Sequence, residues 1–353
     1  MSKIKVFLGG YINYNNAQNL NCRDVARFLD KEKFDVFTLS LYSGNLSKIK
    51  INGVRIFNCF YPYRVSVYFG YFWGIWNADV VYLPKNDHLI FNSFILRVLN
   101  KQCFMSVESV YNDEYISFAR KKNISPFTKI LSFAYADRLY PITKFIGKFV
   151  SEKYDLEIEE DVLHLGCDVI AFENNKEIFE LKNILMIGNA LNEKGVFEYL
   201  YLADKFKDLS FHIVGSGHDL DNKEKLFEKY SNVIYHAVLD HSELNQLFLQ
   251  IDLHILLSKT EGFPKVVIEA ASAKIPSILY SHYGASDWLL SGQDCFIIDN
   301  VNQAVEKLQF LQENPMELDK LSKRAYYSSR KFSWEKRIKH WERIIIKESM
   351  KLR

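Results

Sequence analysis

Short apolar runs alternate with longer mixed segments along the whole chain, and this rhythm starts afresh in the second half. Such alternation is typical of parallel sheets whose faces are covered by helices. Strands are predicted in the first half at residues 4–9, 34–41, 54–58, 80–83, 103–107, 138–141 and 162–165, and in the second half at 183–187, 210–214, 233–235, 252–257, 277–279 and 295–298. The sequence therefore predicts an α/β chain with two Rossmann-like domains facing a central cleft.

Helices are predicted between these strands, and start signals fix some of their boundaries. Asp240 is followed three residues later by Glu243, which is the spacing of a capping box. The predicted helices are 21–30, 89–99, 195–206, 241–250, 265–274 and 301–312, with mostly helical structure from Met316 onward. Ser333 is a suitable N-cap for a last helix at about 333–353.

The boundary between the two domains is predicted at a polar, charged stretch, residues 173–177. A chain of 353 residues is long for a single core and favours two. We expect an N-terminal domain at 1–170 and a C-terminal domain at 178–332. Sheets of this type bind ligands outside the carboxyl ends of their strands, so a functional site is expected in the loops there.

Composition excludes several classes of protein. The net charge of +2 is too small to indicate a nucleic-acid partner. Five widely spaced cysteines without a CxxC pair argue against a disulfide framework or a zinc site, and they favour a reducing cytoplasm. The first residues lack the features of a signal peptide, and no stretch of about 18 uninterrupted apolar residues is present. We therefore expect a cytoplasmic protein without a transmembrane span.

Aromatic residues are concentrated at 57–76, in the run FNCFYPYRVSVYFGYFWGIW. One interpretation is a core helix with its lead-in. The other is a contact with a membrane surface or a lipid acceptor, because amphipathic aromatic side chains settle at the headgroup level. A small basic cluster at Arg120, Lys121 and Lys122 is usually a solvated face, but it is also compatible with anionic lipid.

The sharpest chemical signal is the segment TEGFPKVVIEAA at residues 260–271, which follows a buried-looking strand. Pro264 suits the first turn of a helix, where its missing N–H is not needed. Backbone N–H groups at Lys265, Val266 and Val267 would then point out of the helix start. Together with the positive end of the helix dipole they would form an anion site suited to a diphosphate.

Two carboxylates belong to the same segment. Glu269 lies in the second turn of the predicted helix, and helical side chains lean back toward the N-terminus, which aims it toward Glu261. Glu261 and Glu269, eight residues apart with Gly-Phe-Pro after the first, resemble the E-x7-E motif of glycosyltransferase family 4. The resemblance implies the GT-B fold and retaining transfer from a nucleotide sugar, without an essential metal or other cofactor.

The resemblance also implies roles for these residues. Glu261 would contact sugar hydroxyls near the reacting carbon, and Glu269 would hold the ribose hydroxyls of the donor. The backbone of the intervening turn and helix start would face the phosphate and sugar, which adds Gly262, Phe263, Pro264, Lys265 and Val266 to the donor site.

Further segments match the family in the same order along the chain. Gly188 ends the first strand of the second half, and Lys194 corresponds to the lysine that neutralises the donor diphosphate. Gly215 begins the glycine turn after the next strand, and Gly9 and Gly10 end the first strand of the chain, where the family has a loop facing the donor phosphates. Residues 165–168 resemble the inter-domain linker, and 332–335 resemble the start of a terminal helix that packs back on the N-terminal domain.

Two positions depart from the family pattern. Asn189 stands where the family usually has an arginine, so one of two cations on the diphosphate is missing. Glu108 stands where the family often has a histidine near the sugar. Glu108 could accept a sugar hydroxyl or help to deprotonate an acceptor, or it could be an ordinary glutamate at the end of a strand.

The sequence thus favours a glycosyltransferase of hexosyltransferase type with an acceptor-binding first domain and a donor-binding second domain. The expected partners are a nucleotide sugar and a saccharide or lipid-linked acceptor, in bacterial surface polysaccharide synthesis, with a possible peripheral contact at the inner face of the membrane. Two alternatives stay open: a GT-B sugar-nucleotide epimerase, and a non-catalytic GT-B-like scaffold subunit.

Overall fold

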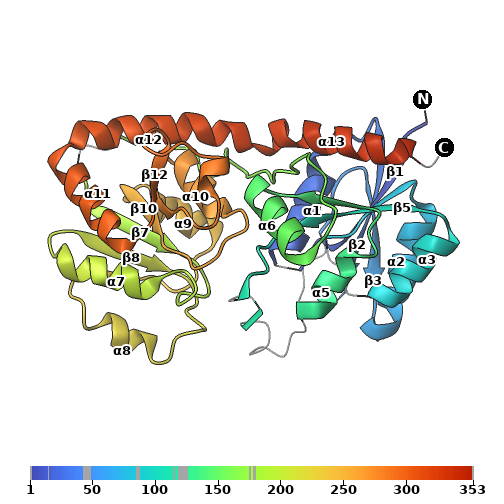
Figure 1. Cartoon of the computed structure of the whole chain (residues 1–353), viewed down its shortest axis with the longest axis horizontal. Coiled ribbons are helices and arrows are strands. Elements are labelled where there is room, and N and C mark those ends of the chain that lie inside the picture. The colour runs from blue at the N-terminus through green and yellow to red at the C-terminus, as the bar shows by residue number, and fades with distance from the viewer. Residues whose placement is uncertain are drawn as a thin grey trace. The chain divides into compact units, whose positions relative to one another are not determined.

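A computed structural model describes residues 2–14, 16–42, 49–84, 88–113, 116–117, 126–174, 176–177 and 180–351, without the side chains of 126–129. The basic cluster at Arg120, Lys121 and Lys122 lies outside these residues. The chain divides into two compact units, Met1–Gly166 with Trp334–Arg353, and Cys167–Ser333. Each unit contains a six-stranded sheet, and all paired strands are parallel (Figure 1).

The first unit has the strand order β3-β2-β1-β4-β5-β6. Its elements are β1 (Ile4–Tyr11), α1 (Ala17–Phe28), β2 (Phe34–Leu41), β3 (Val54–Cys59), α2 (Tyr63–Asn77), β4 (Val80–Tyr82), α3 (Leu89–Val98), β5 (Gln102–Val107), α5 (Pro126–Phe133), β6 (Arg138–Pro141), α6 (Lys144–Tyr154) and, from the end of the chain, α13 (Trp334–Met350).

The second unit has the strand order β12-β11-β10-β7-β8-β9. Its elements are β7 (Asn183–Ile187), α7 (Val196–Lys205), β8 (Ser210–Val214), α8 (Lys223–Phe227), β9 (Val233–Tyr235), α9 (His241–Phe248), β10 (Leu253–Leu256), α10 (Lys265–Ser272), β11 (Ser277–Tyr280), η1 (Ala285–Asp287), β12 (Cys295–Ile298), α11 (Val301–Glu313), α12 (Pro315–Ser329) and η2 (Arg330–Phe332).

Both sheets have a point where the direction of winding reverses. In the second unit the chain runs from β7 outward through β8 to β9, and then returns to add β10 on the other side of β7. The first unit does the same with β1 and β4. In sheets of this kind, ligands bind outside the carboxyl ends of the strands at the point of reversal. For the second unit, that point lies between the loops after β7 and β10.

The central strands of the second unit are buried on both faces. Ile184 and Met186 of β7 belong to one apolar core, whereas Leu185 between them belongs to another with Ala270 of α10. This is expected where helices cover both sides of a parallel sheet, because successive strand residues point to opposite faces. It explains why residues 184–187 of β7 form an uninterrupted apolar run.

Helix α13 is anchored to the first unit by its aromatic residues. The Trp334 indole donates to Asp24 Oδ2 at 3.1 Å and stacks on Phe28, and the Trp341 indole donates to the His164 carbonyl at 3.3 Å. A Cβ atom at Gly166 would lie 2.3 Å from the Trp334 ring, so any side chain at this position would clash with the indole.

The expected elements match the structure closely, with one error. Each of the other predicted strands overlaps an observed strand, and the capping box of Asp240 and Glu243 is confirmed at the start of α9. Residues 162–165 were predicted as a strand, which is wrong. The Leu163 N–H donates to the Pro141 carbonyl at 2.7 Å, and four residues earlier the Glu159 N–H donates to the Leu139 carbonyl at 2.8 Å, which is not the regular spacing of a ladder.

The aromatic run at 57–76 forms the end of β3 and most of α2. Helix α2 buries one face against the sheet and exposes the other, so it is neither a fully buried core helix nor a free surface helix. None of the helices in the described part of the chain combines the length and hydropathy that crossing a bilayer requires.

Candidate functional site

The glycine turns after β7 and β8 lie in close contact with each other. Gly215 has φ +146°, and a Cβ atom there would lie 1.8 Å from the Gly188 carbonyl oxygen, so this position requires glycine. Asn189 joins the same two turns, because its Oδ1 accepts from the Ser216 N–H at 3.2 Å and its carbonyl accepts from the Ser216 hydroxyl at 3.1 Å. Asn189 therefore has a local role in holding the turns together.

Lys194 and Glu261 form an ion pair at the point of reversal of the second sheet. Lys194 comes from the loop after β7 and Glu261 from the loop after β10, the strand that pairs with β7. The Ser258 hydroxyl also donates to Glu261 Oε1 at 2.6 Å. The lysine side chain is 26% exposed and the glutamate side chain 9%, so the lysine is the more accessible partner.

Backbone geometry brings these two side chains together. Gly195, directly after Lys194, has φ +81°, and a Cβ atom there would lie 2.2 Å from the Leu257 carbonyl oxygen. A Cβ atom at Gly188 would lie 2.5 Å from Lys194 Cγ. Glycine at both positions thus lets the lysine stem run close to the backbone that follows β7 and β10.

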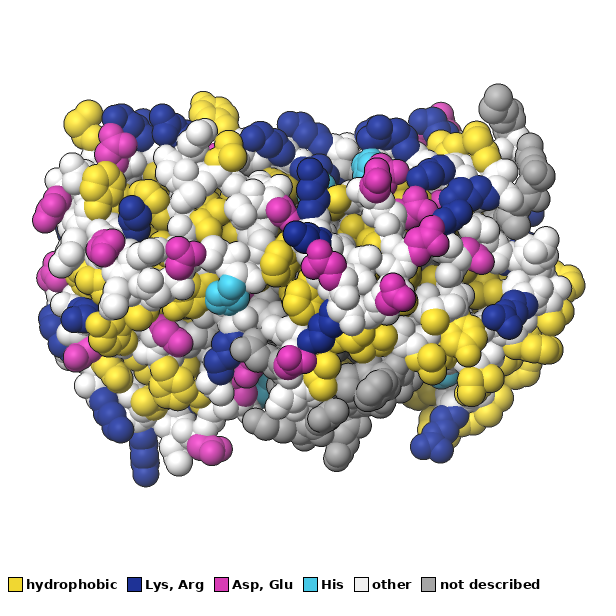
Figure 2. All heavy atoms as spheres, in the orientation of Figure 1, with side chains coloured by type: hydrophobic (Ala, Val, Ile, Leu, Met, Phe, Trp, Pro, Cys, Tyr) yellow, Lys and Arg dark blue, Asp and Glu magenta, His cyan; other side chains and the backbone are white. Residues whose placement is uncertain are grey.

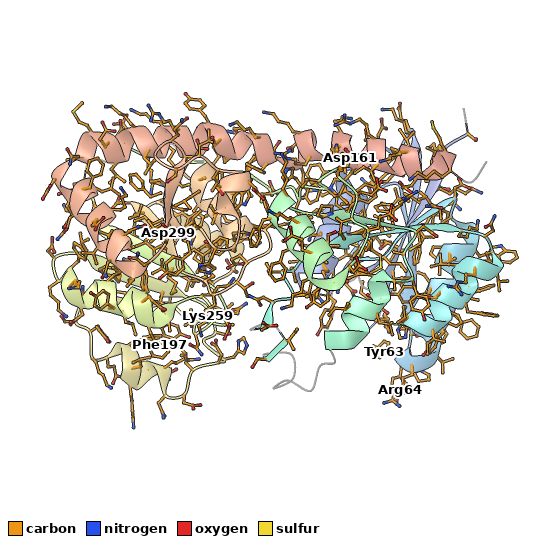
Figure 3. All side chains as sticks on the ribbon, in the orientation of Figure 1. Tyr63, Arg64, Asp161, Phe197, Lys259 and Asp299 are labelled. Carbon is orange, nitrogen blue, oxygen red and sulfur yellow. The ribbon has the colours of Figure 1, made fainter. Side chains whose placement is uncertain are left out.

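The loop that contains Glu261 is held by two further side chains. His282, which follows β11, places Nε2 3.0 Å from both the Ser258 and the Lys259 carbonyl oxygens. Because carbonyls only accept, Nε2 carries the hydrogen and donates to both. Lys259, which Figure 3 labels, donates from Nζ to Asn192 Oδ1 at 3.2 Å, and this bond ties its loop to the loop that leads to Lys194. Sequence reasoning did not place His282 in the site, because its hydrogen bonds go to backbone carbonyls, which residue spacing does not reveal.

The start of α10 is apolar on its inner side. Phe263 is buried, with its ring centroid 4.9 Å from that of Trp288 and 5.6 Å from that of Phe332. Pro264 is the N-cap, and α10 begins at Lys265. Gly262 and Val266 flank this anchor and are partly exposed. The aromatic cluster fixes the turn that connects Glu261 to the helix.

One detail of the expected anion site is wrong. Val267 does not offer its N–H at the helix start, because this group donates to the Pro264 carbonyl at 3.0 Å. The tight turn after the proline closes this bond within three residues, so Val267 is no part of the anion site. Glu269 lies in the second turn of α10, as expected, and is partly exposed.

The predicted residues of the first unit lie at the carboxyl ends of β1 and β5. Gly10 packs closely on α1, where a Cβ atom would lie 2.7 Å from Cys22 Sγ, and Gly9 accepts from the Tyr71 hydroxyl at 3.1 Å through its carbonyl. Neither glycine has a positive φ. Close packing against neighbouring side chains, and not backbone strain, therefore explains the two glycines.

Glu108 belongs to a hydrogen-bond network beneath α1. Its Oε1 accepts from the Ser106 hydroxyl at 2.7 Å and from the Tyr82 hydroxyl at 3.4 Å, and its Oε2 accepts from Asn21 Nδ2 at 3.2 Å. Burial, and then the charge of Glu108, raise the pKa of Tyr82, so this phenol stays protonated and donates. Both carboxylate oxygens are engaged within the unit, and a role of Glu108 toward a sugar stays a prediction.

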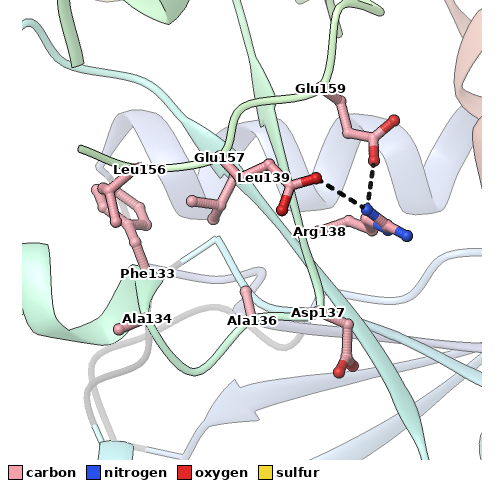
Figure 4. Close-up of a pocket in the computed structure, with 9 residues that line it drawn as sticks. All are labelled: Phe133, Ala134, Ala136, Asp137, Arg138, Leu139, Leu156, Glu157 and Glu159. Atoms are coloured by element: carbon pink, nitrogen blue, oxygen red, sulfur yellow. Dashed lines mark ion pairs between the residues drawn. The ribbon is translucent and has the colours of Figure 1, made fainter. Parts of the chain in front are cut away.

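A separate surface pocket opens beside the start of β6 in the first unit (Figure 4). Arg138 pairs there with Glu157 at 3.6 Å and Glu159 at 3.2 Å, and Asp137 accepts from the Cys103 N–H at 2.7 Å. The pocket lies at the amino end of β6, whereas sites in such sheets form at the carboxyl ends. Arg138, the positive group of this pocket, is paired with two carboxylates, and the pocket is no candidate for the donor.

In the described part of the chain, no group of three or more His, Cys, Asp and Glu residues is arranged to hold a metal ion.

Comparison with known proteins identifies the second unit. Residues 170–331 match the family described as glycosyl transferases group 1. The chain is a glycosyltransferase. It is 24% identical over 281 residues to an uncharacterized glycosyltransferase of Haemophilus influenzae, an alignment that covers 76% of each protein. It is 27% identical over 178 residues to the O-antigen biosynthesis glycosyltransferase WbnH of Escherichia coli, covering 49% of this chain and 48% of that one.

Solved structures confirm the fold of this glycosyltransferase. Anabaena HepE, crystallised in complex with UDP and glucose, superposes with a TM-score of 0.75 at 11% identity, covering 98% of this chain and 100% of HepE. The predicted α/β GT-B class is thereby confirmed, and the Lys194–Glu261 pair lies in the unit that matches the family.

Proposed function

We propose that this glycosyltransferase takes its sugar from a nucleoside diphosphate sugar bound at the carboxyl ends of β7, β8 and β10. The observation that carries the proposal is the Lys194–Glu261 pair, which places a cation and a carboxylate at the point of reversal of the sheet. In this proposal Lys194 neutralises the diphosphate leaving group, and Glu261 contacts the sugar beside it.

The start of α10 supports an anionic ligand at the same edge. The helix dipole favours negative charge there, and the N–H groups at the start of a helix lack acceptors within the helix. Gly188 and Gly215 leave the neighbouring turns without side chains, so a phosphate can approach the backbone. Glu269 is then assigned to the ribose, and retention of configuration without a metal follows the family 4 resemblance.

The acceptor is proposed to be a saccharide or a lipid-linked saccharide in bacterial surface polysaccharide synthesis. WbnH, which serves O-antigen biosynthesis, supports this assignment, and the UDP and glucose in HepE support UDP-sugars as the first donors to test. The first unit would bind the acceptor at the inner face of the membrane.

Removal of the lysine tests the proposal. Lys194→Ala is expected to lower transfer roughly 100-fold, because a cation on a leaving diphosphate acts mainly in the transition state. Transfer is measured as release of free nucleotide in the presence of acceptor, after thermal shifts with UDP-, GDP-, ADP-, CDP- and dTDP-sugars have identified the donor. Lys205→Ala is the matched control, because it removes one exposed positive charge from the far end of α7.

Each outcome has a defined meaning. Wild-type turnover in Lys194→Ala, with unchanged thermal stability, would remove this residue from the site. Formation of an isomerised nucleotide sugar, without release of free nucleotide, would show that the enzyme is an epimerase and not a transferase.

A further inference from the structure

The first unit exposes an apolar face on two neighbouring helices, α2 and α3. The exposed side chains of α2 are Val65, Tyr68, Phe69, Phe72 and Trp76, and those of α3 are Ile90, Phe94 and Val98. Spacings of three, four and seven residues place side chains on one side of a helix. Hydrophobic side chains gather over α2 and α3 in Figure 2. We call these eight residues the α2–α3 face.

The two stripes form one continuous surface. The Tyr68 ring lies 4.9 Å from that of Phe91 and 4.8 Å from that of His88, which connects α2 to the start of α3. Phe69 is 59% exposed, Phe94 61% and Ile90 86%. A monomeric soluble protein rarely leaves a contiguous apolar surface of this kind without a function.

The opposite side of α2 is fixed to the sheet. Tyr71 and Ile75 are fully buried, and a Cβ atom at Gly74 would lie 2.2 Å from the Phe7 ring. These contacts hold α2 against β1 and fix which of its side chains face solvent. Its exposed aromatic side chains are a stable feature of the folded unit, and a partner would meet them as a preformed surface.

Charge selects between possible partners of this face. Neither α2 nor α3 contains an aspartate or glutamate, whereas each contributes one exposed arginine, Arg64 and Arg97. Arg64 lies at the beginning of α2 (Figure 3), and Arg97 lies over the Tyr135 ring at 5.8 Å. A second copy of the chain would set these arginines against their equivalents with no acidic residue of either helix to neutralise them, whereas phospholipid headgroups supply the opposite charge.

We propose that the α2–α3 face docks on the surface of an anionic phospholipid bilayer. Tyr68, Phe69, Trp76 and Phe94 enter the boundary between headgroups and acyl chains, where aromatic rings are favoured, and Arg64 and Arg97 bind headgroup phosphates. The protein docks in its folded form, since α2 stays packed on the sheet. This proposal is independent of the donor site in the second unit.

Vesicle binding by the full-length protein tests the proposal. The expected result is co-sedimentation with vesicles of phosphatidylglycerol and phosphatidylcholine at low salt, and weaker binding to phosphatidylcholine alone. Phe69→Ser/Phe94→Ser is expected to reduce partitioning roughly tenfold or more, because two apolar anchors are lost. Tyr327→Ser is the matched control, as it removes an exposed aromatic side chain of α12 in the other unit. Arg64→Glu/Arg97→Glu is expected to abolish the preference for phosphatidylglycerol.

Three results would overturn the proposal. The first is a folded wild-type protein that binds neither type of vesicle. The second is binding that the Phe69→Ser/Phe94→Ser variant retains in full. The third is a dimer in solution, without vesicle binding, that dissociates in that variant, which would make the face a contact between copies. Thermal shifts with the nucleotide-sugar panel, measured on the same variant, report on the donor site separately.

Discussion

At the scale of single residues, Glu261 would compete with a diphosphate for the ammonium group of Lys194. Glu261→Gln keeps the shape of the side chain but releases Lys194 from its ion pair. A partly exposed pair of this kind contributes about 0.2–1 kcal/mol, so nucleoside diphosphate affinity is expected to rise up to about fivefold. Transfer is expected to fall roughly 100-fold, because the carboxylate contacts the sugar in the proposed site.

Isothermal titration with the nucleoside diphosphate and a transfer assay measure the two effects of Glu261→Gln. Glu193→Gln is the control, since Glu193 pairs at 3.7 Å with a different lysine, Lys259. Tighter diphosphate binding together with undiminished transfer would show that Glu261 restrains Lys194 but does not act on the sugar.

His282 gives a second prediction at this scale. Its imidazole holds the Ser258 and Lys259 carbonyls just before Glu261, so His282→Leu is expected to lower kcat roughly tenfold, with a smaller change in KM. His282→Gln retains an N–H donor and is expected to recover part of that loss. Equal activity of the leucine and glutamine variants, or a change confined to KM, would contradict a positioning role.

The sequence predicted where Lys194 and Glu261 lie in the fold because motif order follows strand order. Lys194 and Glu261 were each placed after a strand candidate, and parallel pairing of β7 with β10 brings the two loops together. The sequence did not predict their ion pair, which depends on the αL backbone of Gly195. Nor did it show that Asn189 joins the turns after β7 and β8, because such bonds depend on backbone positions that residue spacing does not specify.

At the scale of elements, the apolar runs defined the strands well because the central strands of both sheets are buried on their two faces. The apolar pattern failed for a segment whose conformation depends on contacts with residues far away in the sequence. Residues 162–165 are apolar enough for a strand, yet their backbone meets β6 irregularly. Helix α1 begins at Ala17, before the predicted residue 21, because the Asn16 side chain caps it by accepting from the Asn19 N–H.

Helix α13 supplies a prediction at the same scale, because it buries a carboxylate in the first unit. Glu348 is fully buried and accepts from the Tyr140 hydroxyl at 2.6 Å, Gln102 Nε2 at 3.1 Å and Lys351 Nζ at 2.8 Å. Glu348→Ala leaves the buried Tyr140 hydroxyl and the partly buried Gln102 amide without this acceptor, and it is expected to destabilise the first unit by about 2–4 kcal/mol. Glu348→Gln, which keeps an acceptor, should cost less.

Urea denaturation measures the change in free energy of unfolding for the Glu348 variants. Hydrogen exchange of the α13 amides shows whether the destabilisation lies at this helix. Glu335→Ala removes an exposed carboxylate from the first turn of the same helix and serves as the control. If Glu348→Ala and Glu335→Ala unfold at the same urea concentration, the buried network adds nothing to stability.

At the scale of the whole molecule, buried histidines in both units make folding stability depend on pH. Burial lowers the pKa of His164 in the first unit to about 4, that of His212 in the second unit to about 4, and that of His254 to about 3. His212 Nδ1 also lies 2.9 Å from His236 Nε2, so a positive charge on one imidazole would repel a positive charge on the other. His254, in strand β10, is fully buried. These imidazoles are therefore neutral in the folded protein well below the usual histidine pKa of 6.5.

The sign of the pH effect follows from which state binds the proton. Well above pH 6.5 the histidines are neutral in both states and do not change the stability. Between pH 6.5 and about 4 they take up protons when unfolded but not when folded, so stability falls with falling pH. At pH 5.5 the loss is about 1 kcal/mol for each of His212 and His254. Urea denaturation at pH 7.5, 6.5, 5.5 and 4.5 should show a progressive decline that begins near 6.5. A flat profile down to pH 5 would mean that these imidazoles gain solvent or counter-charge in the folded state.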